Sequence, residues 1–172
     1  LGFVVLFAMY SYRSVEREMA GQFNREQMLL AQQTAMGIEQ YMQDIINVLT
    51  LTSHIQPVAD GDPDEIRISL ENAYRSLKNK VSFVFWENSE GIMTYHVPRE
   101  VLPEMDGRDF SFRTYFRIAR ELGVPFVSDI ITMGGEQYQD IPDRFETFVI
   151  SLPLKGSDGS FNGVIGDRKS VV

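Results

Sequence analysis

The side chains best suited to bind a small ligand lie in the segment GRDFSFRTYFRIA, Gly107 to Ala119. Arg113 and Tyr115 stand near the start of an expected helix that follows a loop, where free backbone N–H groups and the positive end of the helix dipole favour an anion. The planar guanidinium of Arg113 can add two parallel hydrogen bonds to a carboxylate. These residues predict a carboxylate site. The alternative is that Arg113 pairs with one of the many acidic residues, while Tyr115 and Phe116 belong to the core.

A second group of polar side chains follows on the next expected strand, PFVSDIIT, at Pro125 to Thr132. Ser128 can supply a hydroxyl, and Asp129 a carboxylate suited to an amine. The connection from Met133 to Phe145 is long and contains two glycines and Tyr138. Because long connections of this kind often cover a site, we predict a flap, closed by Tyr138.

Nothing along the chain makes a convincing catalytic constellation. The two histidines, His54 and His96, fall in an expected helix and an expected strand, and neither belongs to a nucleophile or metal signature. MGGEQ, at Met133 to Gln137, is similar to the GG[DE]E[FL] signature of diguanylate cyclases, but the chain lacks the rest of such a domain. We therefore expect a domain with no enzymatic activity, no metal site and no cofactor.

Length and composition indicate one acidic globular domain. The chain has 172 residues, about the length of a single domain, and 44% of them are hydrophobic. A formal charge of −8 repels phosphate backbones and argues against a nucleic-acid partner. The absence of cysteine excludes disulfides, thiol nucleophiles and thiolate metal sites.

The chain opens on an uncharged apolar stretch, LGFVVLFAMYSY, at residues 1–12. A membrane-spanning helix needs about 20 such residues, so this stretch is too short to span alone. We interpret it as the end of a truncated transmembrane helix, because the helical pattern continues from it without a turn residue. A buried first strand or helix of an ordinary domain, or the core of a signal peptide, are the alternatives.

From Arg13 to about Ile55 the sequence contains no proline and is rich in strong helix formers. Apolar residues recur from Phe23 to Leu49 at spacings of three, four and seven, which leaves one stripe for packing. A helix of this length reaches about 65 Å, so we expect part of it to project as a stalk. Two ordinary helices broken near Gly37 are the alternative.

A second helix should follow the acidic stretch DGDPDE, with Asp62 as its cap and Pro63 at its first position. The same carboxylates, with Glu71, partly imitate a calcium-binding loop. Glu65, however, occupies the position at which that loop needs glycine. We therefore favour the cap over calcium.

After Lys80 the apolar period changes from helical to strand-like. The pattern predicts an α+β fold in which a five-stranded antiparallel sheet has helices on one side. The expected strands are Val81–Glu87, Ile92–Val97, Pro125–Thr132, Glu146–Leu154 and Ser160–Gly166, and a helix capped by Ser111 and closed by Gly123 lies between the second and the third.

This order of elements, together with two motifs, resembles the extracytoplasmic Cache (PAS-like, PDC) sensor domains of bacterial sensor histidine kinases and methyl-accepting chemotaxis receptors, of the double-Cache type. The motifs are G-x-D-F-S-x-R-x-Y-F at Gly107, Asp109, Phe110, Ser111, Arg113, Tyr115 and Phe116, and F-x-G-V-x-G at Phe161, Gly163, Val164 and Gly166. The ending GDRKSVV departs from the usual close of that family.

The resemblance implies a membrane-anchored receptor whose pocket lies between the sheet and the segment carrying Arg113. C4-dicarboxylate sensor kinases have a similar F-R-x-Y-F segment, and amino-acid chemoreceptors have Arg-x-Trp-Tyr with downstream aspartates. In this chain Tyr115 and Phe116 replace the Trp-Tyr pair, while Asp129 and Asp167 fall near the amine-binding aspartates. The ligand-binding residues implied are Arg113, Tyr115, Phe116, Ser128, Asp129, Tyr138 and Asp167.

We therefore predict the ligand-sensing domain of a two-component or chemotaxis receptor, extracytoplasmic (periplasmic) and joined to the cell membrane by a transmembrane helix. It should bind a small organic acid or amino acid and pair as a homodimer through the long helix. The alternative is a PAS-like dimerisation module without a ligand. The parts expected are the transmembrane end at 1–12, two helices at 13–80, a PAS-like core at 81–166 and a tail at 167–172.

Overall fold

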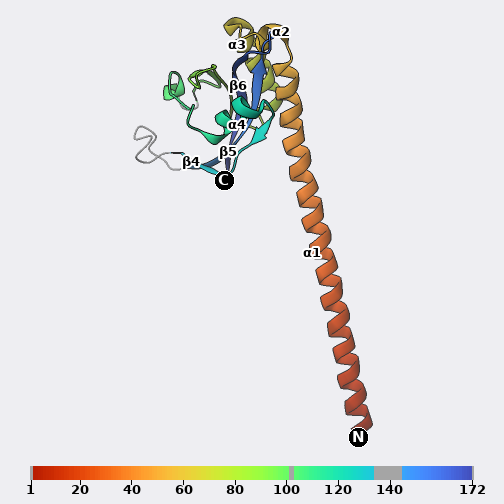
Figure 1. Cartoon of the computed structure of the whole chain (residues 1–172). Helices are drawn as coiled ribbons and strands as arrows, with labels where there is room; N and C mark the ends of the chain where they lie inside the picture. The colour runs from red at the N-terminus through yellow and green to blue at the C-terminus, as the bar shows by residue number, and fades with distance from the viewer. Residues whose placement is uncertain (1, 101–102, 134–144, 172) are drawn as a thin grey trace. The chain divides into compact units, whose positions relative to one another are not determined.

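One antiparallel sheet and the helices packed on it make up most of the fold (Figure 1). The structure, a computed structural model, describes residues 2–100, 103–133 and 145–171. The elements in chain order are α1 (Gly2–Ser53), α2 (Gln56–Ala59), α3 (Pro63–Leu77), β1 (Phe83–Glu87), β2 (Met93–Val97), the short 3-10 helix η1 (Pro103–Met105), α4 (Thr114–Leu122), β3 (Phe126–Val127), β4 (Ile131–Met133), β5 (Phe145–Lys155) and β6 (Phe161–Val171).

Helix α1 is continuous through Gly37, which agrees with one long helix and not with two helices broken there. By its contacts the chain divides into two units, residues 1–42 and residues 43–172. The first unit consists of α1 alone, and from Phe23 to Ile38 its apolar side chains are exposed. In the described residues, no helix has an apolar stretch long enough to cross a membrane. The projecting stalk remains a prediction.

The last turns of α1 belong to the second unit, in which Ile45 and Leu49 are fully buried. Asp44 also forms an ion pair with Lys80, which follows α3. Helix α3 begins where the sequence predicted: Asp62 caps it by accepting hydrogen bonds from the backbone N–H groups of Asp64 and Glu65, at 3.0 and 3.1 Å. The prediction that Asp62 caps this helix is thus confirmed.

The strands are ordered β2-β1-β6-β5-β3, and β4 also pairs with β5. The sequence predicted one strand over Pro125–Thr132, but the structure divides it into β3 and β4, which pair with different parts of β5. The five-stranded arrangement is therefore right in outline, with two short strands sharing its last position.

Helices cover both faces of the sheet, not one face as predicted. Tyr95 and Trp86 are partners on β2 and β1, and the Tyr95 hydroxyl donates to Glu71 of α3 at 3.1 Å. Their neighbour Phe85 must point to the other face because successive side chains of a strand alternate, and its ring lies 6.0 Å from that of Tyr115 in α4. Helix α3 covers the first of these faces, and its apolar residues Ile66, Leu70 and Leu77 are buried.

Two boundaries differ from the sequence prediction. Helix α4 begins at Thr114, with Arg113 and not Ser111 as its N-cap residue, because residues 109–113 form a tight turn before it. Strand β6 continues to Val171, so residues 167–171 form strand, not a tail, and pair with β5 along their length. The predicted helix end is confirmed, since Gly123 adopts the left-handed conformation with φ 63°.

Candidate functional site

A small cavity lies between the sheet and the segment that precedes α4. Its volume is about 20 Å³, close to the room needed by one water molecule. Among the described residues its walls are mostly aromatic and aliphatic, and three polar side chains, Arg113, Thr147 and Arg168, also line it. The apolar and aromatic walls come from Phe83, Phe85, Met93, Met105, Phe110, Tyr115, Ile131 and Val149.

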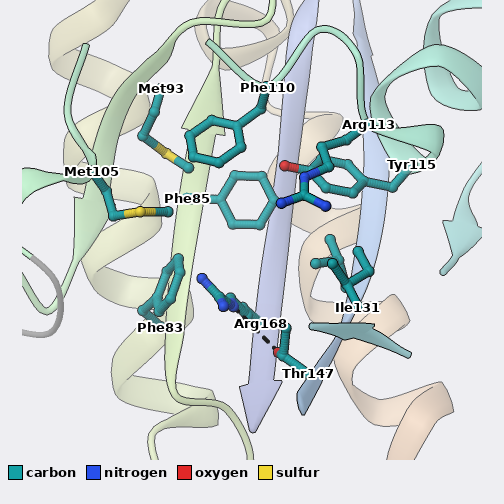
Figure 2. Close-up of a pocket in the computed structure, with 11 residues that line it drawn as sticks. Phe83, Phe85, Met93, Met105, Phe110, Arg113, Tyr115, Ile131, Thr147 and Arg168 are labelled. Carbon is teal, nitrogen blue, oxygen red and sulfur yellow. Dashed lines mark hydrogen bonds between the residues drawn. The ribbon is translucent and has the colours of Figure 1, made fainter. Parts of the chain in front are cut away.

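Arg113 and Arg168 reach into this cavity from different elements, as Figure 2 shows. Arg168 projects from β6 and is only 4% exposed; its Nε donates to the Thr147 hydroxyl at 3.3 Å, and its guanidinium lies 5.4 Å from the centre of the Phe83 ring. Arg113 is half-buried and occupies the N-cap position of α4. Two guanidinium groups on one apolar cavity create a local positive potential, although the whole chain carries a charge of −8.

The turn before α4 explains the G-x-D-F-S-x-R motif. The Asp109 carboxylate accepts a hydrogen bond from the backbone N–H of Ser111 at 2.8 Å, and Phe110 is buried in the core. The N–H of Phe110 donates to the carbonyl of Gly91 at 2.8 Å, and the N–H of Arg113 donates to the carbonyl of Phe110 at 2.9 Å. These contacts anchor the turn against the β1–β2 hairpin and set the start of α4, which directs Arg113 and Tyr115 to the cavity.

The Tyr115 hydroxyl donates to Glu87 Oε1 at 2.6 Å. Glu87 is the last residue of β1, is fully buried, and its other oxygen has no hydrogen-bond partner in the described part of the chain. Burial raises the pKa of Glu87 to about 8, against the lowering effects of the Tyr115 hydrogen bond and of the Arg113 charge. The same burial and the nearby Glu87 raise the pKa of Tyr115. The carboxyl group of Glu87 is therefore mostly neutral at pH 7.

The structure places Asp167 away from the cavity, although the sequence put it among the ligand-binding residues. Asp167 is the partner of Val84 and Ile150, whose side chains point to the α3 face of the sheet. It is fully buried there, and its Oδ1 accepts a hydrogen bond from the Ile150 N–H at 3.2 Å. Burial raises its pKa to about 8. The resemblance fixed its place along the chain but not the face of the sheet to which it points.

The other predicted residues divide between core, surface and segments that the structure does not describe. Phe116 is buried with its ring edge-on to Phe161, at 5.7 Å, as the core alternative expected. Ser128 accepts a hydrogen bond from the Val149 N–H at 2.9 Å and donates to the Asp129 carbonyl at 2.8 Å. Asp129 is exposed, and neither of the two lines the cavity. Tyr138 lies outside the described residues.

Sequence reasoning missed Arg168 and Glu87. For Arg168 a signal was present: the alternation Val164, Gly166, Arg168 places it on the same sheet face as Phe83, but only if β6 is extended into the ending GDRKSVV. Glu87 closes an apolar strand, and nothing in the sequence tells that it is buried. The structure alone brings it to Tyr115.

His96, which belongs to no motif, helps to position one wall of the cavity. It is fully buried on β2, and its Nδ1 lies 2.8 Å from Asp106 Oδ1. Asp106 also forms an ion pair with Arg99. These contacts fix the loop that follows η1, and η1 in turn places Met105 at the cavity wall.

No protein-family model and no curated protein sequence matches this chain. Solved structures do match. An extracellular ligand-binding receptor from Desulfohalobium retbaense DSM5692 is 17% identical with a TM-score of 0.67, and the match covers 80% of this chain and 24% of that one.

Two ligand-binding domains of Pseudomonas aeruginosa PAO1 amino-acid chemoreceptors also match. The PctC domain, in complex with GABA, is 18% identical with a TM-score of 0.56, covering 77% of this chain and 55% of that one. The PctB domain, in complex with L-Arg, is 17% identical with a TM-score of 0.58, and the match covers 77% of this chain and 51% of that one. This chain therefore spans only a quarter to about half of the length of the structures it matches.

At these identities the likeness shows the fold alone: the chain shares its α+β fold with these ligand-binding proteins, as the resemblance to Cache domains predicted. The double-Cache subtype remains a prediction.

Proposed function

We propose that this chain is the ligand-sensing domain of a membrane-bound receptor, either a sensor histidine kinase or a chemoreceptor, and that it has no catalytic role of its own. Its ligand is a small carboxylate-bearing molecule, an organic acid or an amino acid. The domain works on the extracytoplasmic side, and a transmembrane helix joins it to the membrane. The sensor folds that it resembles support this proposal.

One observation carries the proposal: Arg113 and Arg168 line the same cavity, beside the hydroxyl of Thr147. Guanidinium groups form short, charge-assisted hydrogen bonds to carboxylates, often in pairs. The aromatic walls exclude water, which strengthens such bonds. Arg113 holds one carboxylate, and Arg168, whose Nε donates to the Thr147 hydroxyl, adds guanidinium donors on the sheet side. Tyr115 shapes the wall between them.

The cavity of about 20 Å³ is far smaller than an ordinary ligand pocket, so the ligand must bind a more open form of this region. Ligand binding then shifts the population of the two forms by its difference in affinity for them. The residues that change lie on one face of the sheet, and the end of α1 with Ile45 and Leu49 lies within the same unit. We propose that this shift reaches α1 and rearranges the long helices of the receptor.

We further propose that two copies pair through α1. Several large apolar side chains of α1 are exposed in this chain: Met19, Phe23, Met28, Leu29, Leu30, Met36 and Ile38. Ile45 and Leu49 cannot take part, since they are buried in the second unit. The proposed contact between the two copies is therefore limited to the first part of the stripe from Phe23 to Leu49, which ends before Ile45. Sedimentation of the chain, compared with a variant that has polar residues at Phe23 and Leu30, tests this pairing.

The small cavity favours a second candidate, a PAS-like dimerisation module whose pocket is filled by its own side chains. Thermal unfolding separates the two. Millimolar dicarboxylates, amino acids and other small acids are added one by one, and a ligand that binds the folded state raises the unfolding temperature by mass action. Arg113→Ala should greatly reduce any such shift. A panel without a single hit would support the ligand-free module.

A further inference from the structure

We infer that Glu87 is a positioning residue of the proposed ligand site: it holds the Tyr115 hydroxyl in place through a proton-bearing carboxyl group, and it thereby couples the affinity for an anionic ligand to pH. The inference rests on the proposed function. Glu87 itself does not line the cavity. It acts through Tyr115, which does.

The geometry ties the two residues closely. The Tyr115 hydroxyl and Glu87 Oε1 are 2.6 Å apart, and both side chains are almost fully buried. On its other side Tyr115 packs its ring edge-on against Phe85, and its carbonyl accepts a hydrogen bond from Ser151 at 3.2 Å. Neither the ring nor the hydroxyl can move without breaking one of these contacts. Glu87 therefore helps to hold the Tyr115 wall of the cavity in the form seen in this structure.

The backbone of Glu87 is closely packed between its neighbouring strands. A bulge between Trp86 and Glu87 alters the pairing of β1 with β2 at that point. On the other side Gly163 of β6 approaches so closely that a Cβ there would collide with the carbonyl oxygen of Glu87. Glycine with φ 121° is thus required at position 163, and it lets β6 approach the backbone of Glu87 closely.

The charged groups around Glu87 come from three elements. Arg113, at the start of α4, favours the ionised carboxylate, and Asp109, in the preceding turn, opposes it. Arg168, on β6, acts on the neighbouring Tyr115, whose pKa its charge lowers. With Glu87 neutral, the region carries the two guanidinium charges. With Glu87 ionised, one negative charge is added beside them, which weakens the attraction for an anion.

Burial decides the protonation state. An ionised Glu87 would leave Oε2 without a hydrogen-bond partner in the described part of the structure, and removing a charge from water is costly. The pKa near 8 follows from this desolvation. An anionic ligand placed beside Arg113 and Arg168 adds negative charge and raises that pKa further. By linkage, anion binding is therefore tighter below the pKa and weakens as the pH rises through it.

Succinate is a suitable probe, because it is mostly doubly ionised at the lower end of the range of interest and fully so above it. We expect its affinity for the wild-type chain, measured by titration calorimetry, to fall about threefold to tenfold between about pH 6.5 and pH 9.5. In Glu87→Gln the amide oxygen still accepts the Tyr115 hydroxyl but cannot ionise, so the affinity should not fall over this range. Asp167→Asn is the matched control: it removes another buried carboxyl group on the opposite face, and the fall should persist.

An equal fall in wild type and Glu87→Gln would overturn the inference and leave the proposed function standing. If neither succinate nor any other carboxylate binds at any pH, the proposed function fails, and the coupling fails with it. The infrared band of a protonated carboxyl group, recorded without ligand as the difference between the wild-type chain and Glu87→Gln, tests the proton on Glu87 directly, because the buried carboxyl group of Asp167 contributes to both spectra. A spectrum that shows Glu87 ionised at pH 7 contradicts the inference whatever the ligand does.

Discussion

Asp167 and Arg168, adjacent in β6, point to opposite faces of the sheet. Arg168 is paired with Phe83 and lies over its ring in the cavity, and Asp167 is paired with Val84 under the helices of the other face. Both side chains are nearly fully buried. One strand thus carries a cation on the proposed ligand-binding face and a carboxyl group in the opposite core, and substitutions at the two positions should have different effects.

Loss of either arginine should weaken carboxylate binding. Arg113→Ala removes the hydrogen-bond donors of one guanidinium group. Arg168→Met keeps the length and apolar character of the side chain while removing its charge. Because hydrogen bonds between charged groups contribute about 1.5–3 kcal/mol, we expect each variant to bind the best carboxylate of the panel about 10- to 100-fold more weakly. Calorimetry measures this, and circular dichroism confirms folding. Asp167→Asn should bind as the wild type does; an equal loss there would place the ligand elsewhere.

The stability of the domain should fall as the pH rises from about 4 to about 8. Burial raises the pKa values of Glu87 and Asp167 to about 8, far above the values of 4.5 and 3.8 for exposed groups. In this interval the unfolded chain releases both protons while the folded chain keeps them, so deprotonation favours unfolding. The stabilisation is complete below the unfolded pKa and is lost as the pH passes the folded pKa.

Urea denaturation at a series of pH values measures this dependence. Asp167→Asn retains an oxygen that accepts the Ile150 N–H, and it should flatten the pH dependence, as should Glu87→Gln. The double variant should be flatter than either single one. Identical slopes in wild type and double variant would show that both carboxyl groups are ionised in the folded domain.

Two glycine substitutions should act in opposite directions. Gly163 has φ 121°, and an added Cβ would meet the backbone of Glu87, so Gly163→Ala should destabilise the domain strongly and disturb the Glu87–Tyr115 pair. Gly37 lies in α1 with nothing within 4 Å of an added Cβ. Gly37→Ala should therefore stabilise the helix by about 1 kcal/mol. Thermal unfolding followed by circular dichroism compares them; a neutral Gly163→Ala would contradict the close approach of β6 to β1.

Truncation of Leu49 should detach the end of α1 from the second unit. Leu49 is fully buried, and a buried leucine replaced by alanine costs about 2–5 kcal/mol. Leu51, two positions later and 73% exposed, gives the matched control, with an expected change below about 0.5 kcal/mol. Chemical denaturation of Leu49→Ala and Leu51→Ala measures the difference. Equal effects would mean that α1 ends without packing in the second unit.

Local chemistry determined much of the fold from the sequence alone. The proline-free run rich in helix formers is one helix, Asp62 caps α3, Gly123 ends α4, and the strand-like segments form an antiparallel sheet. Each of these features depends on propensities and hydrogen bonds within a few residues, which the order of amino acids specifies directly. The choice of Arg113 and Tyr115 as candidate site residues also came from such local reasoning, and both line the cavity.

Tertiary structure decided the composition of the candidate site. Arg168 enters it because β6 continues past Gly166 beside β1, and Glu87 enters it because α4 lays Tyr115 over the end of β1. Asp167 leaves it because a shift of one residue along a strand changes the face. Burial and strand pairing involve residues far apart in the chain, and burial is the main cause that raises the pKa of Glu87 to about 8. The sequence supplied the side chains, and only the packed sheet determined which of them share a cavity.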